Sequence, residues 1–98
     1  MSPKRLKVPS EIARLIRGLH PQLKQKVRSS LKMVLDDPEA GKALRFELAG
    51  LRSFRIGSFR LIYRVGRGHI EIVALGPREC IYEETWRLVR REAEKRED

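Results

Sequence analysis

The chain has 98 residues, enough for one small domain that we expect to span 1–98, and its apolar content of 41% excludes a disordered tail. It carries 22 Lys and Arg against 13 Asp and Glu, and the net charge of +9 favours a polyanionic partner: nucleic acid, an acidic protein segment or a membrane surface. One cysteine excludes an intramolecular disulfide, and no window approaches the roughly 18 apolar residues of a membrane span, so we expect a soluble, cytoplasmic protein.

The N-terminal third predicts a short strand and a helical hairpin. Residues 4–8 are typical of an edge strand, which Pro9 ends. Ser10 is the expected N-cap of a first helix. Apolar side chains then recur at helical spacing at Ile12, Leu15, Ile16 and Leu19. Pro21 suits the first position of a second amphipathic helix, which ends at residues 36–38 because the residue before a proline disfavours helical angles.

The rest of the chain predicts an antiparallel meander and a last helix. Turns are expected at 57–58 and 66–68, and apolar residues alternate between them with Arg60, Ile62 and Arg64. Residues 70–75 are apolar on both faces, as in a central strand, and the last helix is expected from Glu79 onward. Because turns this short join antiparallel strands, the predicted class is α+β: an N-terminal helical hairpin packed on a curled, mainly antiparallel sheet of three or four strands, with a C-terminal helix. We expect the helices to cover one face of this sheet.

The usual catalytic constellations are missing from the sequence. His20 and His69 lie far apart without acidic partners at ligand spacing, and both are interpreted as surface residues. Cys80 alone cannot form a zinc site, and there is no phosphate-binding glycine loop or serine-nucleophile motif. The sequence therefore predicts no metal and no cofactor.

Arginine is concentrated on the predicted strands. Six arginines fall within 23 residues and only Glu47 balances them: Arg45, Arg52, Arg55, Arg60, Arg64 and Arg67. Arg60 and Arg64 are expected on one side of their strand, with Arg55 across the turn from Arg60. Neighbouring cations repel one another unless an anion binds between them. Either they bind such an anion, or they form a solvated face paired with helix carboxylates such as Glu83 and Glu84.

Arg78 and Tyr82 stand four residues apart, which places them on one face of the last helix if that helix has begun by Arg78. A tyrosine beside arginines can stack on a base and hydrogen-bond a phosphate, although the ring can equally pack its helix on the sheet. These residues suggest RNA cleavage by attack of a 2′-hydroxyl on its own phosphate, a reaction that needs alignment and nearby cations rather than a metal.

Two segments resemble the RelE/ParE toxin superfamily. Residues 48–65, LAGLRSFRIGSFRLIYRV, resemble its central hairpin, and residues 75–82, LGPRECIY, resemble its last-strand-to-helix junction, where a basic residue and a tyrosine recur at this separation. The resemblance covers nearly the whole chain. It implies a type II toxin that cleaves mRNA on the ribosome and so inhibits translation. It also implies a cognate antitoxin, acidic and encoded by the adjacent gene, that forms a hetero-oligomer with the toxin and covers its basic site.

The resemblance also implies roles for particular residues. Arg60 would stabilise the scissile phosphate, Arg78 would lie near the leaving oxygen, and Tyr82 would stack on or orient the nucleotide. Arg55 joins this catalytic set at a position where RelE has a lysine. The other four arginines of the strand region are expected to bind the RNA backbone, namely Arg45, Arg52, Arg64 and Arg67.

Departures from the family pattern leave alternatives open. A lysine can act as a base when its pKa is lowered, whereas an arginine hardly can. Cleavage is then weak or uses another group, such as Glu83. Ser53 also stands near a second position where RelE is basic, and Arg52, one residue away, would face the other side of the strand. The alternatives are a ParE-like gyrase inhibitor and an inactive module that binds nucleic acid or an antitoxin.

Overall fold

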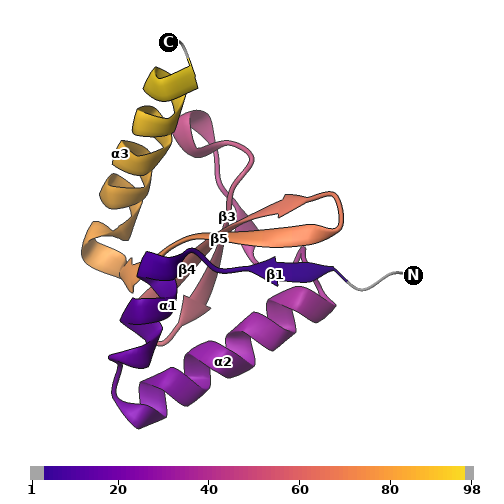
Figure 1. Ribbon diagram of the computed structural model, residues 1–98, viewed down its shortest axis with the longest axis vertical. Coiled ribbons are helices and arrows are strands. Elements are labelled where there is room, and N and C mark those ends of the chain that lie inside the picture. Colours follow the sequence, from indigo (N-terminus) through magenta and orange to yellow (C-terminus); the bar gives the residue numbers. More distant parts are fainter. Residues whose placement is uncertain (1–3, 97–98) are drawn as a thin grey trace.

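The computed structural model describes residues 4–96. This part of the chain contains five strands, three α-helices and one 3₁₀ turn (Figure 1). In chain order they are β1 (Arg5–Lys7), α1 (Ser10–Arg17), α2 (Pro21–Asp36), β2 (Lys42–Ala43), η1 (Phe46–Leu48), β3 (Arg52–Ile56), β4 (Phe59–Gly66), β5 (His69–Pro77) and α3 (Arg78–Arg96). None of these helices is long and apolar enough to cross a membrane. The α+β class and the helix–helix–meander–helix order are confirmed.

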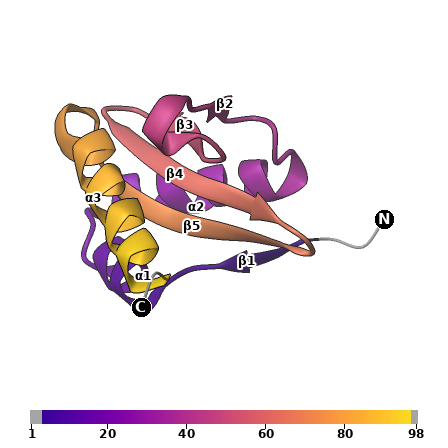
Figure 2. The ribbon, with the colours of Figure 1, turned by 90° about the horizontal axis from the view of Figure 1, so that it is seen from above.

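The sheet is larger and more open than the sequence indicated. The five strands of the described chain lie in the order β1-β5-β4-β3-β2 (Figure 2). Neighbours pair antiparallel except β1, which runs parallel to β5. Three or four strands were expected, and the edge strand predicted at residues 4–8 is confirmed as β1. The additional strand is β2, which has two residues. The sheet is open and uncurled, not curled as expected, and β1 and β2 are its two edges.

The helices lie on both faces of the sheet, not on one as the sequence suggested. In Figure 1, α1 and α2 lie below the sheet, and α3 and η1 lie above it. Each layer buries its own apolar cluster. The larger cluster joins α1 and α2 to residues that include Leu61, Tyr63 and Ile72. The smaller one joins α3 to Leu51, Ile62 and Ala74. Both faces of β4 are therefore covered, which explains why this strand carries apolar residues at consecutive positions.

A register shift between β4 and β5 allows β5 to contribute side chains to both apolar clusters. Ile62 pairs with Ala74 but Tyr63 pairs with Ile72, so Val73 is the extra residue of a β-bulge. Ile72 and Leu75 consequently both face α1 and α2, although they are three residues apart. A strand with strict alternation would point them to opposite faces.

The helix starts differ in detail from the expected ones. Pro9, not Ser10, is the N-cap of α1, and no side chain caps this helix. Pro21 begins α2 as predicted, and Nδ1 of the exposed His20 accepts a hydrogen bond from the Gln22 amide at 3.2 Å. The helix α3 begins at Arg78, directly after β5 and one residue earlier than expected.

Tyr63 fixes the loop between α2 and β2. Its side chain is fully buried, and its hydroxyl donates to the Pro38 carbonyl oxygen and accepts from the Gly41 amide, both at 2.8 Å. A Cβ at Gly41 would lie 2.6 Å from that hydroxyl, so only glycine fits there. Burial raises the pKa of Tyr63 above its ordinary value.

Candidate nucleic-acid interface

Arg55 and Arg60 face each other at the end of the β3–β4 hairpin. They are directly opposed in the antiparallel register, which places their Cα atoms roughly 4.5–5.5 Å apart. On its other side Arg60 pairs with Gly76, which has no side chain to crowd it. Arg55 is exposed and its Nε donates to the Gly57 carbonyl oxygen at 3.4 Å, whereas Arg60 is half-buried. Two cations thus occupy neighbouring positions on the sheet face that carries α3.

The first turn of α3 brings two more functional groups to the same end of the sheet. The Arg78 amide donates to the Ser58 carbonyl oxygen at 3.0 Å, which holds the start of α3 against the hairpin turn. Tyr82 follows one helical turn later and is half-buried. Its hydroxyl lies 3.1 Å from Oγ of Ser53, which is buried on β3, two residues from Arg55 and on the same face. We call Arg55, Arg60, Arg78 and Tyr82 the hairpin-end cluster.

The arginines of the hairpin-end cluster form no ion pair with any carboxylate of the described chain. The alternative of a basic face neutralised by helix carboxylates therefore does not hold for these three arginines. Glu83 instead pairs with Arg87 at 2.7 Å along α3. The cluster therefore combines three uncompensated guanidinium groups with one phenol, a set suited to a phosphodiester.

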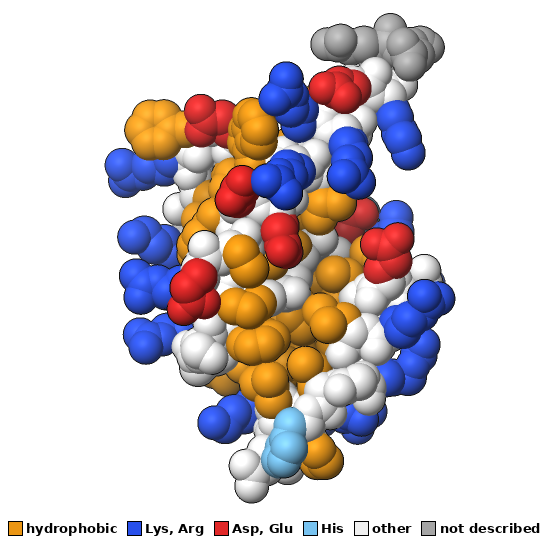
Figure 3. Space-filling model, turned by 90° about the vertical axis from the view of Figure 1, so that its left-hand side faces the viewer, with side chains coloured by type: hydrophobic (Ala, Val, Ile, Leu, Met, Phe, Trp, Pro, Cys, Tyr) orange, Lys and Arg blue, Asp and Glu red, His pale blue; other side chains and the backbone are white. Residues whose placement is uncertain are grey.

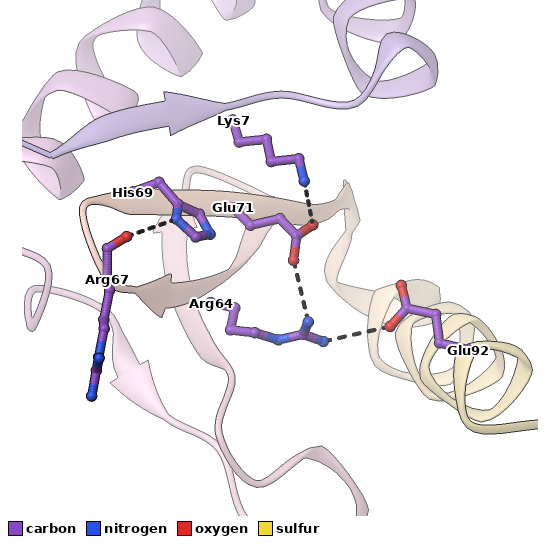
Figure 4. A network of polar contacts seen from close by, with 6 residues as sticks. All are labelled: Lys7, Arg64, Arg67, His69, Glu71 and Glu92. Atoms are coloured by element: carbon purple, nitrogen blue, oxygen red, sulfur yellow. Dashed lines mark hydrogen bonds and ion pairs between the residues drawn. The ribbon is translucent and has the colours of Figure 1, made fainter. Parts of the chain in front are cut away.

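Arg64 lies on the same sheet face as Arg60, as expected, but its charge is compensated. Its guanidinium lies 3.2 Å from Glu71 of β5 and 3.7 Å from Glu92 of α3, and Glu71 also faces Lys7 of β1 at 3.9 Å (Figure 4). These contacts join four elements of the fold, β1, β4, β5 and α3. The structure thus gives Arg64 a part in holding α3 to the sheet.

The other arginines of the strand region also lie outside the cluster. Arg67 occupies the β4–β5 turn, roughly 23 Å along β4 from Arg60 at about 3.3 Å per residue. Arg52 faces the opposite side of the sheet, where it donates to the Gly41 carbonyl oxygen at 2.7 Å. Arg45 is exposed just before η1, on the same side as α3. The sequence grouped these residues by proximity along the chain, and the sheet separates them.

One contact of the site could not be read from the sequence. Ser53 stood out only as a departure from a basic position, yet it is the partner of the Tyr82 hydroxyl across 29 residues of chain. No local pattern predicts a pairing over that distance.

Other reactive groups give the site little further chemistry. The pKa of the Cys80 thiol is raised by desolvation and by the nearby Glu84 carboxylate, which disfavours the nucleophilic thiolate. Within residues 4–96, no group of three or more His, Cys, Asp and Glu side chains is placed to hold a metal ion.

The fold is shared with toxins of the RelE type. The Mycobacterium tuberculosis RelBE2 toxin–antitoxin complex contains a chain with 29% identity and a TM-score of 0.68, covering 80% of this chain and 94% of that one. The free E. coli toxin RelE, solved as a double mutant, has 20% identity and a TM-score of 0.72, with 92% and 97% of the two chains covered. The archaeal RelE–RelB complex of Pyrococcus horikoshii gives 23% identity and a TM-score of 0.64, covering 78% and 96%. No curated protein matches the sequence.

Residues 6–82 match the family model described as the ParE toxin of the parDE type II toxin–antitoxin system. The match spans most of the chain and both segments that carry the sequence resemblance. The chain belongs to this family, within the RelE/ParE toxin superfamily.

Proposed function

We propose that this toxin is an endoribonuclease that cleaves mRNA on the ribosome and thereby inhibits translation. One observation carries the proposal: Arg55, Arg60 and Arg78, none with an ion-pair partner in the described chain, lie at the same end of the sheet as Tyr82. A polyanion that enters this site gains several charge-assisted hydrogen bonds and relieves the repulsion between the arginines.

The reaction that suits these groups is transesterification within the RNA. The 2′-oxygen forms a bond to its own phosphorus while the bond to the 5′-oxygen of the next nucleotide breaks. The products are a 2′,3′-cyclic phosphate and a free 5′-hydroxyl. Arg60 and Arg78 would stabilise the negative charge that develops on the phosphate and on the leaving oxygen. Tyr82 would stack on a base and so align the 2′-hydroxyl with the phosphate.

Two protons move in this reaction, one away from the 2′-hydroxyl and one to the leaving oxygen. Arginine cannot accept the first, because its pKa exceeds about 12. Tyr82, the neighbouring Glu83 or a group of the ribosome would have to accept it. We expect slower cleavage than in a toxin with a lysine at position 55, because general-base catalysis typically contributes about 10²–10⁴-fold.

A second function, inhibition of gyrase, is favoured by the family model itself, which describes ParE toxins. Arg55, which stands where RelE has a lysine, also favours this function, because a gyrase inhibitor does not need a lysine to act as the general base. Both functions call for an antitoxin, and two of the three similar structures described above are toxin–antitoxin complexes. We propose that the antitoxin of this toxin is encoded by the adjacent gene and covers the hairpin-end cluster with an acidic segment.

The deciding experiment is to induce the toxin alone in a bacterial host and map new mRNA 5′ ends within minutes. The test variant is Arg60→Ala/Arg78→Ala. The matched control is Arg14→Ala/Arg17→Ala, which removes the same charge from α1, where both residues are exposed on the other side of the sheet. New ends inside translated codons, seen with the wild type and control and lost in the test variant, would support the nuclease. Growth arrest without such ends, accompanied by a loss of DNA supercoiling, would favour the gyrase inhibitor.

A further inference from the structure

An apolar groove lies between α1 and α3, and none of the residues that line it belongs to the hairpin-end cluster. Its floor is β5 from Glu71 to Leu75, and its walls are the start of α1 and one side of α3. It has a volume of about 270 Å³. Figure 3 shows this face of the molecule, where apolar side chains gather at the centre and acidic side chains stand among them. Leu88 on the α3 wall keeps 37% of its surface exposed, so part of this apolar surface is open to a partner.

The floor of the groove is an unpaired strand edge. β1 accompanies β5 only from the pair Arg5–His69 to the pair Lys7–Glu71. Pro9 then diverts the chain into α1. From Ile72 onward, β5 has β4 as its only strand neighbour in the described chain. A strand edge presents backbone N–H and C=O groups to which another segment can pair.

The rim of the groove is acidic in a chain whose net charge is +9. Four carboxylates line it: Glu11, Glu71, Glu84 and Glu92. Arg64 is the guanidinium partner of both Glu71 and Glu92, whereas Glu11 and Glu84 form no ion pair with the described residues. This rim repels RNA and anionic lipid, and it attracts lysine and arginine.

We propose that this groove binds a basic, extended segment of a partner protein, which adds a strand to the open edge of β5. Alternate side chains of an added strand point the same way. On the α3 side of the sheet its side chains would pack against Val73 and Leu88 and reach Glu84, and on the α1 side its basic side chains would reach Glu11. The volume of the groove is below the roughly 300–1,000 Å³ typical of pockets that bind small molecules. A peptide suits the site better, because strand addition to an open sheet edge is an established mode of peptide recognition.

The identity of the partner as the antitoxin rests on the proposed function. The antitoxin would then not be acidic throughout, as expected from the sequence, but would also contain a basic segment. Its acidic part would cover the hairpin-end cluster, and a separate basic part would occupy the groove, so the two surfaces would together fix the direction in which the antitoxin wraps the toxin.

Peptide binding to the purified full-length toxin tests the proposal without any nuclease readout, so its failure and the failure of the proposed nuclease are distinguishable. The probe is a fluorescein-labelled peptide of about ten residues, the length of a long strand, in which lysine alternates with valine. A second peptide carries serine in place of each lysine. A third retains the lysines but has alternate backbone nitrogens methylated, which removes the donors that strand addition needs.

The toxin is tested as the wild type, as Glu11→Lys/Glu84→Lys, and as the matched control Glu39→Lys/Glu47→Lys. The control makes the same charge change at exposed residues that do not line the groove. We expect the lysine peptide to bind the wild type and the control about tenfold or more tightly than it binds the groove variant. The serine and methylated peptides should bind the wild type more weakly by a similar factor.

Equal binding of the lysine peptide to all three proteins would overturn the proposal, as would undetectable binding to the wild type. Unchanged affinity of the methylated peptide would overturn the strand-addition geometry. If the wild type instead self-associates in sedimentation and the groove variant does not, the occupant is a second copy of the toxin and the proposal fails. Thermal unfolding of each variant shows whether it is folded.

Discussion

The hydroxyl oxygen of Tyr82 lies 3.1 Å from Oγ of Ser53, and this contact joins the first turns of α3 to β3. Ser53 is buried and Tyr82 is half-buried, so the hydrogen bond is only partly accessible to water. It holds the tyrosine on the sheet face that carries Arg55 and Arg60. Tyr82 is therefore positioned by the sheet as well as by its own helix.

Replacing Ser53 should test this positioning. We expect Ser53→Ala to lower the free energy of unfolding by about 1 kcal/mol, the net value of one hydrogen bond. We also expect it to slow mRNA cleavage, since a displacement of about 1 Å at a reacting centre can cost up to about 10²-fold in rate. Ser53→Thr keeps the hydroxyl and should restore cleavage. Denaturant unfolding and 5′-end mapping measure the two effects, and unaltered cleavage by Ser53→Ala would show that the contact is only structural.

Arg55→Lys should increase cleavage and make it depend on pH. A lysine at this position would lie directly opposite Arg60, and a neighbouring cation lowers the pKa of an amine. Its neutral form could accept the proton of the 2′-hydroxyl, so cleavage by the variant should rise between about pH 6 and pH 9. Arg55→Gln is the control, because it has no amine to titrate. Initial cleavage rates on purified ribosomes across this range measure the effect, and parallel pH profiles for both variants would contradict it.

Arg64→Gln should affect stability but not cleavage. The ion pairs of Arg64 with Glu71 and Glu92 are partly exposed, with 35%, 27% and 52% of the respective side chains accessible. Pairs of this kind contribute about 1 kcal/mol or less. The difference in unfolding free energy from the wild type should shrink as salt is added, because salt screens exposed charges. Urea unfolding at low and high salt measures it, and a fall in cleavage as large as that of Arg60→Ala would place Arg64 in the site after all.

Tyr63→Phe should destabilise the fold and change its response to alkali. The variant leaves the Gly41 amide and the Pro38 carbonyl without their partner, at a cost of about 1–3 kcal/mol. Burial raises the pKa of Tyr63 above 10.0 in the folded chain. The stability that this pKa shift contributes is therefore fully present below the pKa of Tyr63 in the unfolded chain. It is lost as the pH rises through the higher pKa of Tyr63 in the folded chain. Above about pH 10 the wild type should lose stability more steeply than Tyr63→Phe. Identical alkaline slopes in urea unfolding would show that Tyr63 does not control this loss.

The sequence determined the type and order of most elements because these depend on local periodicity. Helical spacing predicted α1 and α2, and alternation between glycine-containing turns predicted β4. Residues 48–65 and 75–82 also carried enough of the family pattern to indicate the superfamily. The pairs Arg55–Arg60 and Arg78–Tyr82 were predictable for the same reason, since a two-residue turn and one helical turn fix such neighbours.

Tertiary structure alone decided how these elements combine, because the contacts involved join residues far apart in the chain. Local pattern predicted an edge strand at residues 4–8, but only the tertiary structure decided that β1 pairs parallel with β5 and so joins Arg5 to His69. The second face of the sheet is buried under α3, and the β-bulge turns Ala74 into that apolar cluster.

The same non-local contacts decided what each arginine does. Arg52 and Arg64 look like Arg55 and Arg60 in the sequence. Backbone carbonyl oxygens of the loop between α2 and β2 bind the first, and carboxylates of β5 and α3 bind the second. A charge pattern shows how many cations a strand carries, but which of them remain free for a ligand depends on the partners that folding brings within hydrogen-bonding distance.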